Sequence, residues 1–170
     1  MADPIASAII RLPATQRWSL RCRPESVAAV GAALGLALPE AMCRATRRGE
    51  RAALHLGPDE WLLRAPAGDV AWIDALASML AGAPFSLVDI SARQIGLMIH
   101  PASASTILSA GCPLDLGDRA FPVGMCTRTI FAKAEVLLWR TEEGMIVEYW
   151  RSFADYVEGL IDQAARDAAW

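Results

Sequence analysis

The stretch FSLVDISARQIGLMIHPASASTILS, from Phe85 to Ser109, decides the fold that we expect. Its first part, Phe85 to Ile90, is rich in β-branched and apolar residues and predicts a strand. A second apolar run, Arg93 to His100, predicts another strand, and Pro101 ends it where a helix can begin. The small and apolar residues from Ala102 to Leu108 fit a helix that packs on a sheet. The predicted order is therefore strand, strand, helix.

The same pattern occurs near the start of the chain and indicates an internal repeat. Leu20 matches Leu97 at an offset of 77 residues (97 − 20). Further along, Leu54 matches Leu138 at an offset of 84 (138 − 54), so we expect a short insertion between Gly111 and Gly124. The alternative is chance similarity, because 54% of the residues are hydrophobic. The repeat predicts an α+β fold of two degenerate ferredoxin-like units, each running strand, helix, strand, strand, helix, strand.

The chain length fits one domain over residues 1–170, which is long enough for a substantial core. We expect pseudo-repeat halves at about residues 17–84 and 85–165, after an N-terminal arm at residues 1–16. The other elements expected are strands at Arg17 to Cys22, Arg51 to Leu56, Glu60 to Ala65, Met125 to Phe131, Glu135 to Arg140 and Gly144 to Tyr149, helices at Pro24 to Leu34, Gly68 to Ala81 and Arg151 to Ala165, and a connector at Leu38 to Gly49.

Composition excludes several classes of function. The net charge of −3, from 16 basic and 19 acidic residues, argues against nucleic acid as a partner. The four cysteines are irregularly spaced, without a Cys-x-x-Cys pair, which predicts reduced thiols and no metal site. The longest charge-free stretch, Gln94 to Leu114, contains two prolines and several serines, so we expect no membrane span. Together these features predict a cytoplasmic protein.

Motifs for catalysis are missing from the sequence. It has no Gly-x-Ser-x-Gly elbow, no Gly-x-Gly-x-x-Gly after a strand and no Gly-x-x-x-x-Gly-Lys. His55 and His100 fit structural or surface positions better than a catalytic triad. Asp89 and Glu135 are the two carboxylates within apolar surroundings, and a turn cap or a pair with Arg93 explains Asp89 equally well. No catalytic residue is therefore expected.

Six tryptophans are more informative, because this residue is enriched in protein interfaces. Trp72 lies off the apolar stripe of its predicted helix, so it packs at the helix edge or faces another chain. Trp150 directly precedes the predicted closing helix, and Arg151 is the first residue of that helix. We take Trp72, Trp150 and Arg151 as the candidate residues of a partner interface.

Four motifs between Arg51 and Ile161 carry a resemblance to a known family. They are Leu56-Gly57-Pro58-Asp59-Glu60-Trp61-Leu62-Leu63, Val88-Asp89-Ile90-Ser91-Ala92-Arg93-Gln94, Gly111-Cys112-Pro113-Leu114-Asp115-Leu116 and Tyr149-Trp150-Arg151-Ser152-Phe153-Ala154-Asp155-Tyr156. In this order they resemble the gamma subunit of heterotetrameric sarcosine oxidase. A wider resemblance is to the folate-binding domain of aminomethyltransferases, whose paired α/β units agree with the repeat.

The resemblance implies a non-catalytic subunit that supports assembly or stability of a flavin-dependent complex. Its partners would be the alpha, beta and delta subunits, which would carry FAD, FMN, NAD and tetrahydrofolate and demethylate sarcosine oxidatively to glycine. This chain would hold no cofactor, and in isolation it would be inactive and prone to self-association. Aminomethyltransferases have an acidic pair that corresponds here only to Glu135, which argues against one-carbon transfer by this chain.

A stand-alone folate or pterin module is the alternative function. Trp61 and Trp139 would stack on the ligand, Arg93 would pair with its carboxylate, and Glu135 is the acidic candidate.

Overall fold

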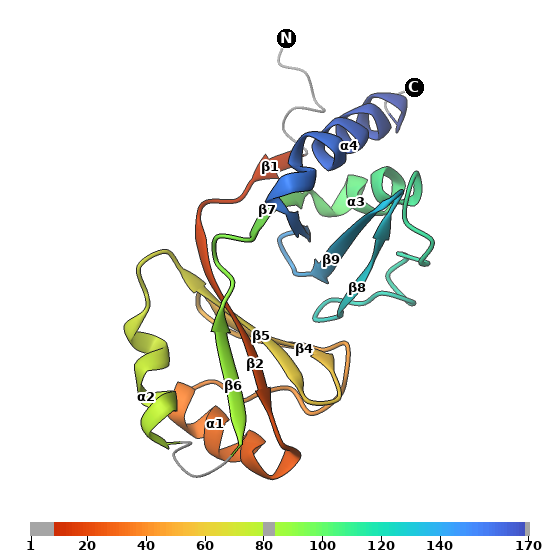
Figure 1. Cartoon of the computed structure of the whole chain (residues 1–170). Coiled ribbons are helices and arrows are strands. Elements are labelled where there is room, and N and C mark those ends of the chain that lie inside the picture. The colour runs from red at the N-terminus through yellow and green to blue at the C-terminus, as the bar shows by residue number, and fades with distance from the viewer. Residues whose placement is uncertain (1–8, 80–83, 169–170) are drawn as a thin grey trace. The chain divides into compact units, whose positions relative to one another are not determined.

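A computed structural model describes residues 9–79 and 84–168 and divides into two compact units (Figure 1). The first unit comprises residues 13–91. The second comprises residues 92–168 together with the N-terminal segment 9–12. The end of the helix expected at Gly68 to Ala81 lies outside the described residues.

The first unit has the ferredoxin-like arrangement, with two helices on one face of an antiparallel sheet. Its elements are β2 (Thr15–Cys22), η1 (Pro24–Ser26), α1 (Val27–Leu34), β3 (Ala45–Arg48), β4 (Arg51–Gly57), β5 (Glu60–Pro66), α2 (Ala71–Met79) and β6 (Phe85–Asp89). The sheet order is β3-β4-β5-β2-β6, so β3 extends the ferredoxin-like set at one edge. Strand β3 lies within the predicted connector at Leu38 to Gly49; its polar sequence, Ala-Thr-Arg-Arg, is that of an exposed edge strand.

Local chemistry explains where α1 begins and ends. Pro24 opens the turn of η1, where its missing N–H costs nothing. Gly35 follows α1 with φ +59°, a left-handed conformation that glycine adopts without strain, and its N–H returns to the Ala32 carbonyl. The chain then turns back over α1 toward the sheet.

The second unit repeats this arrangement and confirms the internal repeat. Its elements are β1 (Ile9–Arg11), β7 (Gln94–Ile99), α3 (Pro101–Ser109), β8 (Cys126–Phe131), β9 (Ala134–Arg140), β10 (Met145–Trp150), η2 (Arg151–Phe153) and α4 (Ala154–Ala168). The sheet order is β1-β7-β10-β9-β8. Leu20 and Leu97 therefore occupy the second strand from equivalent edges, and Leu54 and Leu138 occupy the fourth. The connection at 110–125 is longer than its counterpart at 35–44, as the two offsets predicted.

The expected boundary between the halves is wrong. Phe85–Asp89 was assigned to the second half, but β6 pairs with β2, from Trp18 opposite Asp89 to Cys22 opposite Phe85. The units separate after Ser91 and not after residue 84. The arm expected at residues 1–16 also contains β1, which pairs with β7 and supplies the edge strand of the second unit. That both units form one domain stays a prediction.

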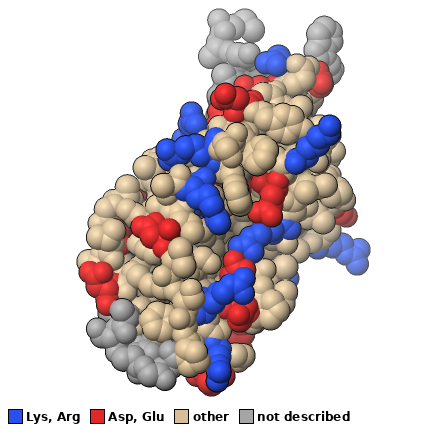
Figure 2. All heavy atoms as spheres, viewed as in Figure 1, with Lys and Arg blue, Asp and Glu red and all other residues tan. Residues whose placement is uncertain are grey.

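Charged side chains of both signs are interspersed on the face of the molecule that Figure 2 shows. Among the described residues, no helix is both long and apolar enough to cross a membrane. The same residues contain no group of three or more His, Cys, Asp or Glu side chains placed to hold a metal ion.

Tyr149 on β10 links three elements of the second unit. Its ring is fully buried, and its hydroxyl donates to Glu158 Oε1 of α4 at 2.8 Å. The same carboxylate oxygen lies 3.3 Å from the Arg11 guanidinium of β1. Burial, followed by the hydrogen bond to the Glu158 carboxylate, raises the pKa of the Tyr149 hydroxyl above its ordinary value.

We expect the chain to lose stability more steeply above about pH 10 than its Tyr149→Phe variant. A raised pKa in the folded state stabilises the chain fully below the unfolded pKa, and this contribution is lost as the pH rises. The difference should approach about 1.4 kcal/mol per pH unit. Urea unfolding at about pH 8 and about pH 11 measures it. Tyr156→Phe, at an exposed tyrosine, is the matched control and should follow the wild type. Equal pH slopes for the wild type and Tyr149→Phe would contradict this expectation.

Candidate functional site

The residues predicted to bind folate are not brought together within either unit. Trp61 lies on β5 of the first unit, whereas Arg93, Glu135 and Trp139 belong to the second. Within the second unit, Glu135 and Trp139 are on β9 and Arg93 directly precedes β7, with β10 between these two strands. The guanidinium of Arg93 packs over the ring of Trp150, 5.2 Å from its centroid.

Glu135 is exposed, so the expectation of apolar surroundings is wrong. The strand alternates, and its neighbours Ala134 and Val136 face the hydrophobic core of the unit while Glu135 faces away from it. Asp89 is also exposed, and its Oδ1 accepts the Ser91 N–H at 2.8 Å, which is the turn-cap alternative. Neither carboxylate is buried, as a catalytic acid or base in an apolar site would be.

Trp72 is a core residue and not the interface residue that we predicted. Its side chain is 6% exposed, and its indole N–H donates to the Leu34 carbonyl at the end of α1, at 2.9 Å. The rings of Trp18 and Trp72 meet edge to face, with centroids 6.2 Å apart. The Arg51 guanidinium carbon lies over the Trp72 ring, 5.1 Å from the ring centroid. Asp69 holds Arg51 in place through two hydrogen bonds of 2.7 and 2.9 Å. Trp72 therefore joins α1, α2 and β4.

Three exposed aromatic side chains follow one another at the end of β10 and the start of α4. Trp150, Phe153 and Tyr156 are 41%, 44% and 41% exposed and stand three positions apart. Arg93 stacks on Trp150, and the Arg151 N–H donates to the Arg93 carbonyl at 2.9 Å. We call these five residues the Trp150 surface. Two of them, Trp150 and Arg151, were predicted as interface residues; Arg93 was predicted as a folate residue.

Phe153 and Tyr156 belong to the helix predicted at Arg151 to Ala165 and were not predicted as interface residues. The buried stripe of α4 begins at Val157 and continues at Ile161 and Ala165. Tyr156 lies one position before the first residue of that stripe. Phe153 belongs to the 3-10 turn η2, which is wound more tightly than an α-helix, so its side chain does not continue the buried stripe of α4. The spacing of aromatic residues at 150, 153 and 156 was the available signal.

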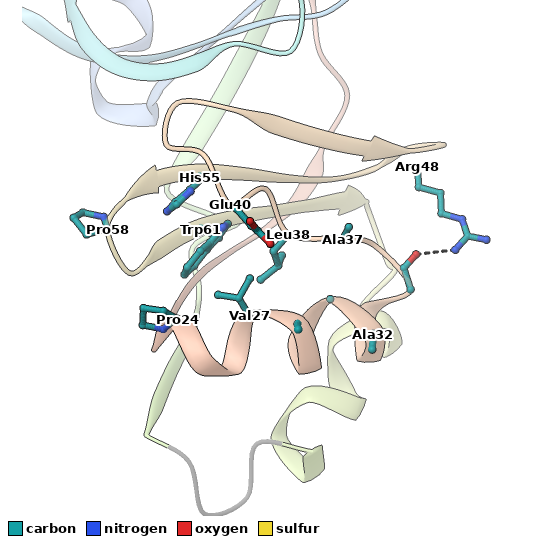
Figure 3. Close-up of a pocket in the computed structure, with 13 residues that line it drawn as sticks. Pro24, Val27, Ala32, Ala37, Leu38, Glu40, Arg48, His55, Pro58 and Trp61 are labelled. Carbon is teal, nitrogen blue, oxygen red and sulfur yellow. Dashed lines mark hydrogen bonds between the residues drawn. The ribbon is translucent and has the colours of Figure 1, made fainter.

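A second feature is a cavity of about 720 Å³ in the first unit, between α1 and the sheet (Figure 3). Trp61 and His55 are opposite each other on β5 and β4, and their rings stack with centroids 4.5 Å apart. Both are buried, and the Trp61 N–H donates to the Pro39 carbonyl at 3.0 Å. The predicted stacking residue Trp61 thus contacts His55, which the sequence analysis assigned to a structural or surface position.

Neither histidine is engaged as a catalytic base. His100 Nδ1 accepts the Ala102 N–H at 3.3 Å and caps α3. Among the described residues, the two ring nitrogens of His55 have no hydrogen-bond partner. A triad requires a histidine hydrogen-bonded to a nucleophile and oriented by a third group, and neither ring meets that geometry.

Comparison with known proteins decides the family. The model of the Sarcosine oxidase, gamma subunit family matches residues 21–167. The chain belongs to the sarcosine oxidase gamma subunit family. This confirms the family resemblance carried by the four motifs.

Relatives of this gamma-family chain are themselves named sarcosine oxidase subunit gamma. The relative from Corynebacterium sp. (strain U-96) is 37% identical over 164 residues, which cover 91% of this chain and 78% of the relative. The relative from Arthrobacter sp is 40% identical over 117 residues, covering 68% of this chain. That match spans 57% of the Arthrobacter relative, less than two thirds of its length.

Solved structures support the same family and fold. Heterotetrameric sarcosine oxidase from Corynebacterium sp. U-96, in complex with pyrrole 2-carboxylate, contains a chain that aligns with a TM-score of 0.86 and 32% identity. The alignment covers 94% of this gamma-family chain and 83% of that chain. Aminomethyltransferase T of the glycine cleavage system from Bartonella henselae aligns with a TM-score of 0.64 at 15% identity, over 90% of this chain and 44% of the other. This confirms the aminomethyltransferase-like α+β fold.

Proposed function

We propose that this chain is a non-catalytic subunit of a heterotetrameric, flavin-dependent sarcosine oxidase and supports the assembly or stability of that complex. The carrying observation is the alignment, at a TM-score of 0.86 over 94% of the chain, with a chain of heterotetrameric sarcosine oxidase. The oxidative demethylation of sarcosine to glycine, linked to tetrahydrofolate, would take place on the partner chains.

The arrangement of the candidate residues supports a role without catalysis. Glu135 is exposed, and neither histidine is engaged as a base among the described residues. These features also weigh against a stand-alone folate or pterin module.

The partners we propose are the alpha, beta and delta subunits, which would hold FAD, FMN, NAD and tetrahydrofolate. We propose a cytoplasmic location as well. Within residues 9–79 and 84–168 no disulfide bond joins any of the four cysteines, Cys22, Cys43, Cys112 and Cys126, which fits a reducing compartment.

The Trp150 surface is our candidate for the contact with a partner. Tryptophan, tyrosine and arginine are the residue types that most often contribute large binding energies at protein interfaces. In this surface, Arg93 already holds the Trp150 ring by stacking, so little side-chain freedom is left to lose on binding.

Co-expression with candidate flavoprotein partners tests the function. We expect the chain to elute in a yellow complex on size exclusion, measured by absorbance at the flavin band. Elution of the wild-type chain alone, with the partners correctly folded, would contradict the proposed subunit role. The Trp150→Ala, Phe153→Ala double variant should reduce co-elution by more than tenfold, because interface aromatics contribute about 2 kcal/mol or more.

Ile130→Ala is the control variant for that experiment. Ile130 is a 51% exposed apolar residue on β8, away from the Trp150 surface in the sequence. It should leave co-elution unchanged. Equal loss for both variants would rule out the Trp150 surface as a specific contact while leaving the subunit role intact.

A further inference from the structure

The cavity in the first unit contains a buried polar group that the fold leaves unsatisfied. His55 is 4% exposed, and neither ring nitrogen has a hydrogen-bond partner among the described residues. Leaving a buried donor or acceptor unpaired is destabilising, so native structures rarely contain such a group without a reason. The indole N–H of its neighbour Trp61 donates to the Pro39 carbonyl, so of these two stacked rings His55 is the one that lacks a hydrogen bond.

The histidine ring forms part of the cavity wall. Figure 3 shows the His55 and Trp61 rings pointing from the sheet toward α1, with Val27 and Pro24 on the opposite side. Neither nitrogen is exposed, so a group in the cavity can pair with one of them only after the ring turns about χ2. That torsion is soft in histidine.

The cavity is long, and small residues form much of its helical wall. It follows the chain from Pro24 to Gly35, 11 positions apart, or roughly 16 Å at the helical rise. The α1 residues that face it include Ala28, Gly31 and Ala32, which project no bulk into it. A slender molecule therefore fits better than a globular one, and the volume of about 720 Å³ lies within the range of small-molecule sites.

The charges at the cavity set an orientation for its ligand. Arg48 lies at the Gly35 end, where its Nη1 donates to the Gly35 carbonyl at 2.7 Å. The guanidinium is exposed and forms no ion pair within residues 9–79 and 84–168. Glu40 lines the cavity beside Trp61 and Leu38, toward the other end (Figure 3). An anionic group is thus favoured at Arg48 and disfavoured near Trp61.

We propose that this cavity binds an elongated, mostly apolar molecule with an anionic group at Arg48 and a neutral hydrogen-bonding group at His55. The apolar body lies along the small residues of α1. This binding activity goes beyond the proposed subunit role and does not depend on it, because every residue that forms the cavity belongs to the first unit.

Calorimetric titration of the full chain with 12-hydroxydodecanoate tests the site. We expect saturable binding that weakens by about tenfold with 1,12-dodecanediol, which lacks the anion, because hydrogen bonds to charged groups are the stronger ones. Arg48→Met should weaken the binding of 12-hydroxydodecanoate by a similar factor and leave the affinity for the diol unchanged. His55→Phe keeps a stacked ring beside Trp61 and should remove the preference for 12-hydroxydodecanoate over dodecanoate.

Two adjacent exposed positions on α1 provide a matched pair of variants. Ala28 lines the cavity and Ala29 does not. Ala28→Trp should abolish binding, whereas Ala29→Trp should bind as the wild type, with circular dichroism confirming that both variants fold. Absence of binding by every probe, or equal binding by both variants, would overturn the proposal. Binding to the free chain that disappears in the complex with flavoprotein partners would overturn it too, because a partner segment would then occupy the cavity.

Discussion

Trp72→Ala should lower the free energy of unfolding by about 3 to 5 kcal/mol, the cost of truncating a large buried aromatic residue. The variant loses the edge-to-face contact with Trp18 and the cover from Arg51, and it leaves a cavity between α1, α2 and β4. It also leaves the Leu34 carbonyl without the indole N–H that satisfies the end of α1. Urea unfolding followed by circular dichroism measures the change.

Trp150→Ala is the matched control for Trp72→Ala, because it makes the same substitution at a tryptophan that is 41% exposed. Its free energy of unfolding should stay within about 0.5 kcal/mol of the wild type, as is usual for surface positions. A stability loss in Trp150→Ala as large as in Trp72→Ala would contradict the core and surface roles assigned to the two residues.

Gly144→Ala should destabilise the chain by about 3 kcal/mol or more, through overpacking and backbone strain together. Gly144 precedes β10 with φ +154°, and a Cβ there would lie 2.3 Å from the carbonyl oxygen of Ile99 on β7. The obstacle is backbone in a sheet strand, which cannot rotate away as a side chain can. The melting temperature and the urea midpoint should both fall.

Gly159→Ala is the control for the glycine substitution. Gly159 is an exposed residue of α4, and a Cβ at this position meets nothing within 4 Å. Alanine is the better helix former, so this variant should gain about 0.5 to 1 kcal/mol. If Gly144→Ala were as stable as the wild type, that result would contradict the close approach of Gly144 to the Ile99 backbone.

The local elements of this fold could be predicted from the sequence because their causes are local. The Gly57-Pro58-Asp59 turn, the alternation of the strands and the proline at the start of α3 each act within a few residues. The repeat was visible because equivalent core positions keep apolar residues at two nearly constant offsets.

Strand pairing could not be predicted, because it depends on partners far away in the sequence. An apolar run such as Phe85 to Asp89 predicts a strand but does not specify whether it pairs with β2 or β7. The three residues of β1 are too few for any pattern, and only their pairing with β7 defines them as a strand.

The same limit applied to the candidate site. The core role of Trp72 depends on a carbonyl 38 positions earlier, at Leu34, and the position of Arg93 depends on Trp150. His55 was read as structural from its neighbours Leu54 and Leu56, which are on the same strand. The cavity it borders is formed by α1, which lies more than 20 positions earlier in the chain.

The origin of β1 has a consequence for the order in which the chain folds during synthesis. The first unit takes all its strands from residues 15–89, so its sheet can close as these residues leave the ribosome. Residues 9–11 leave the ribosome earlier but have to wait, unpaired, until β7 has been made. Strand β1 is therefore completed only when the second unit is made, and removal of residues 9–11 should disturb the unit that contains residues 92–168.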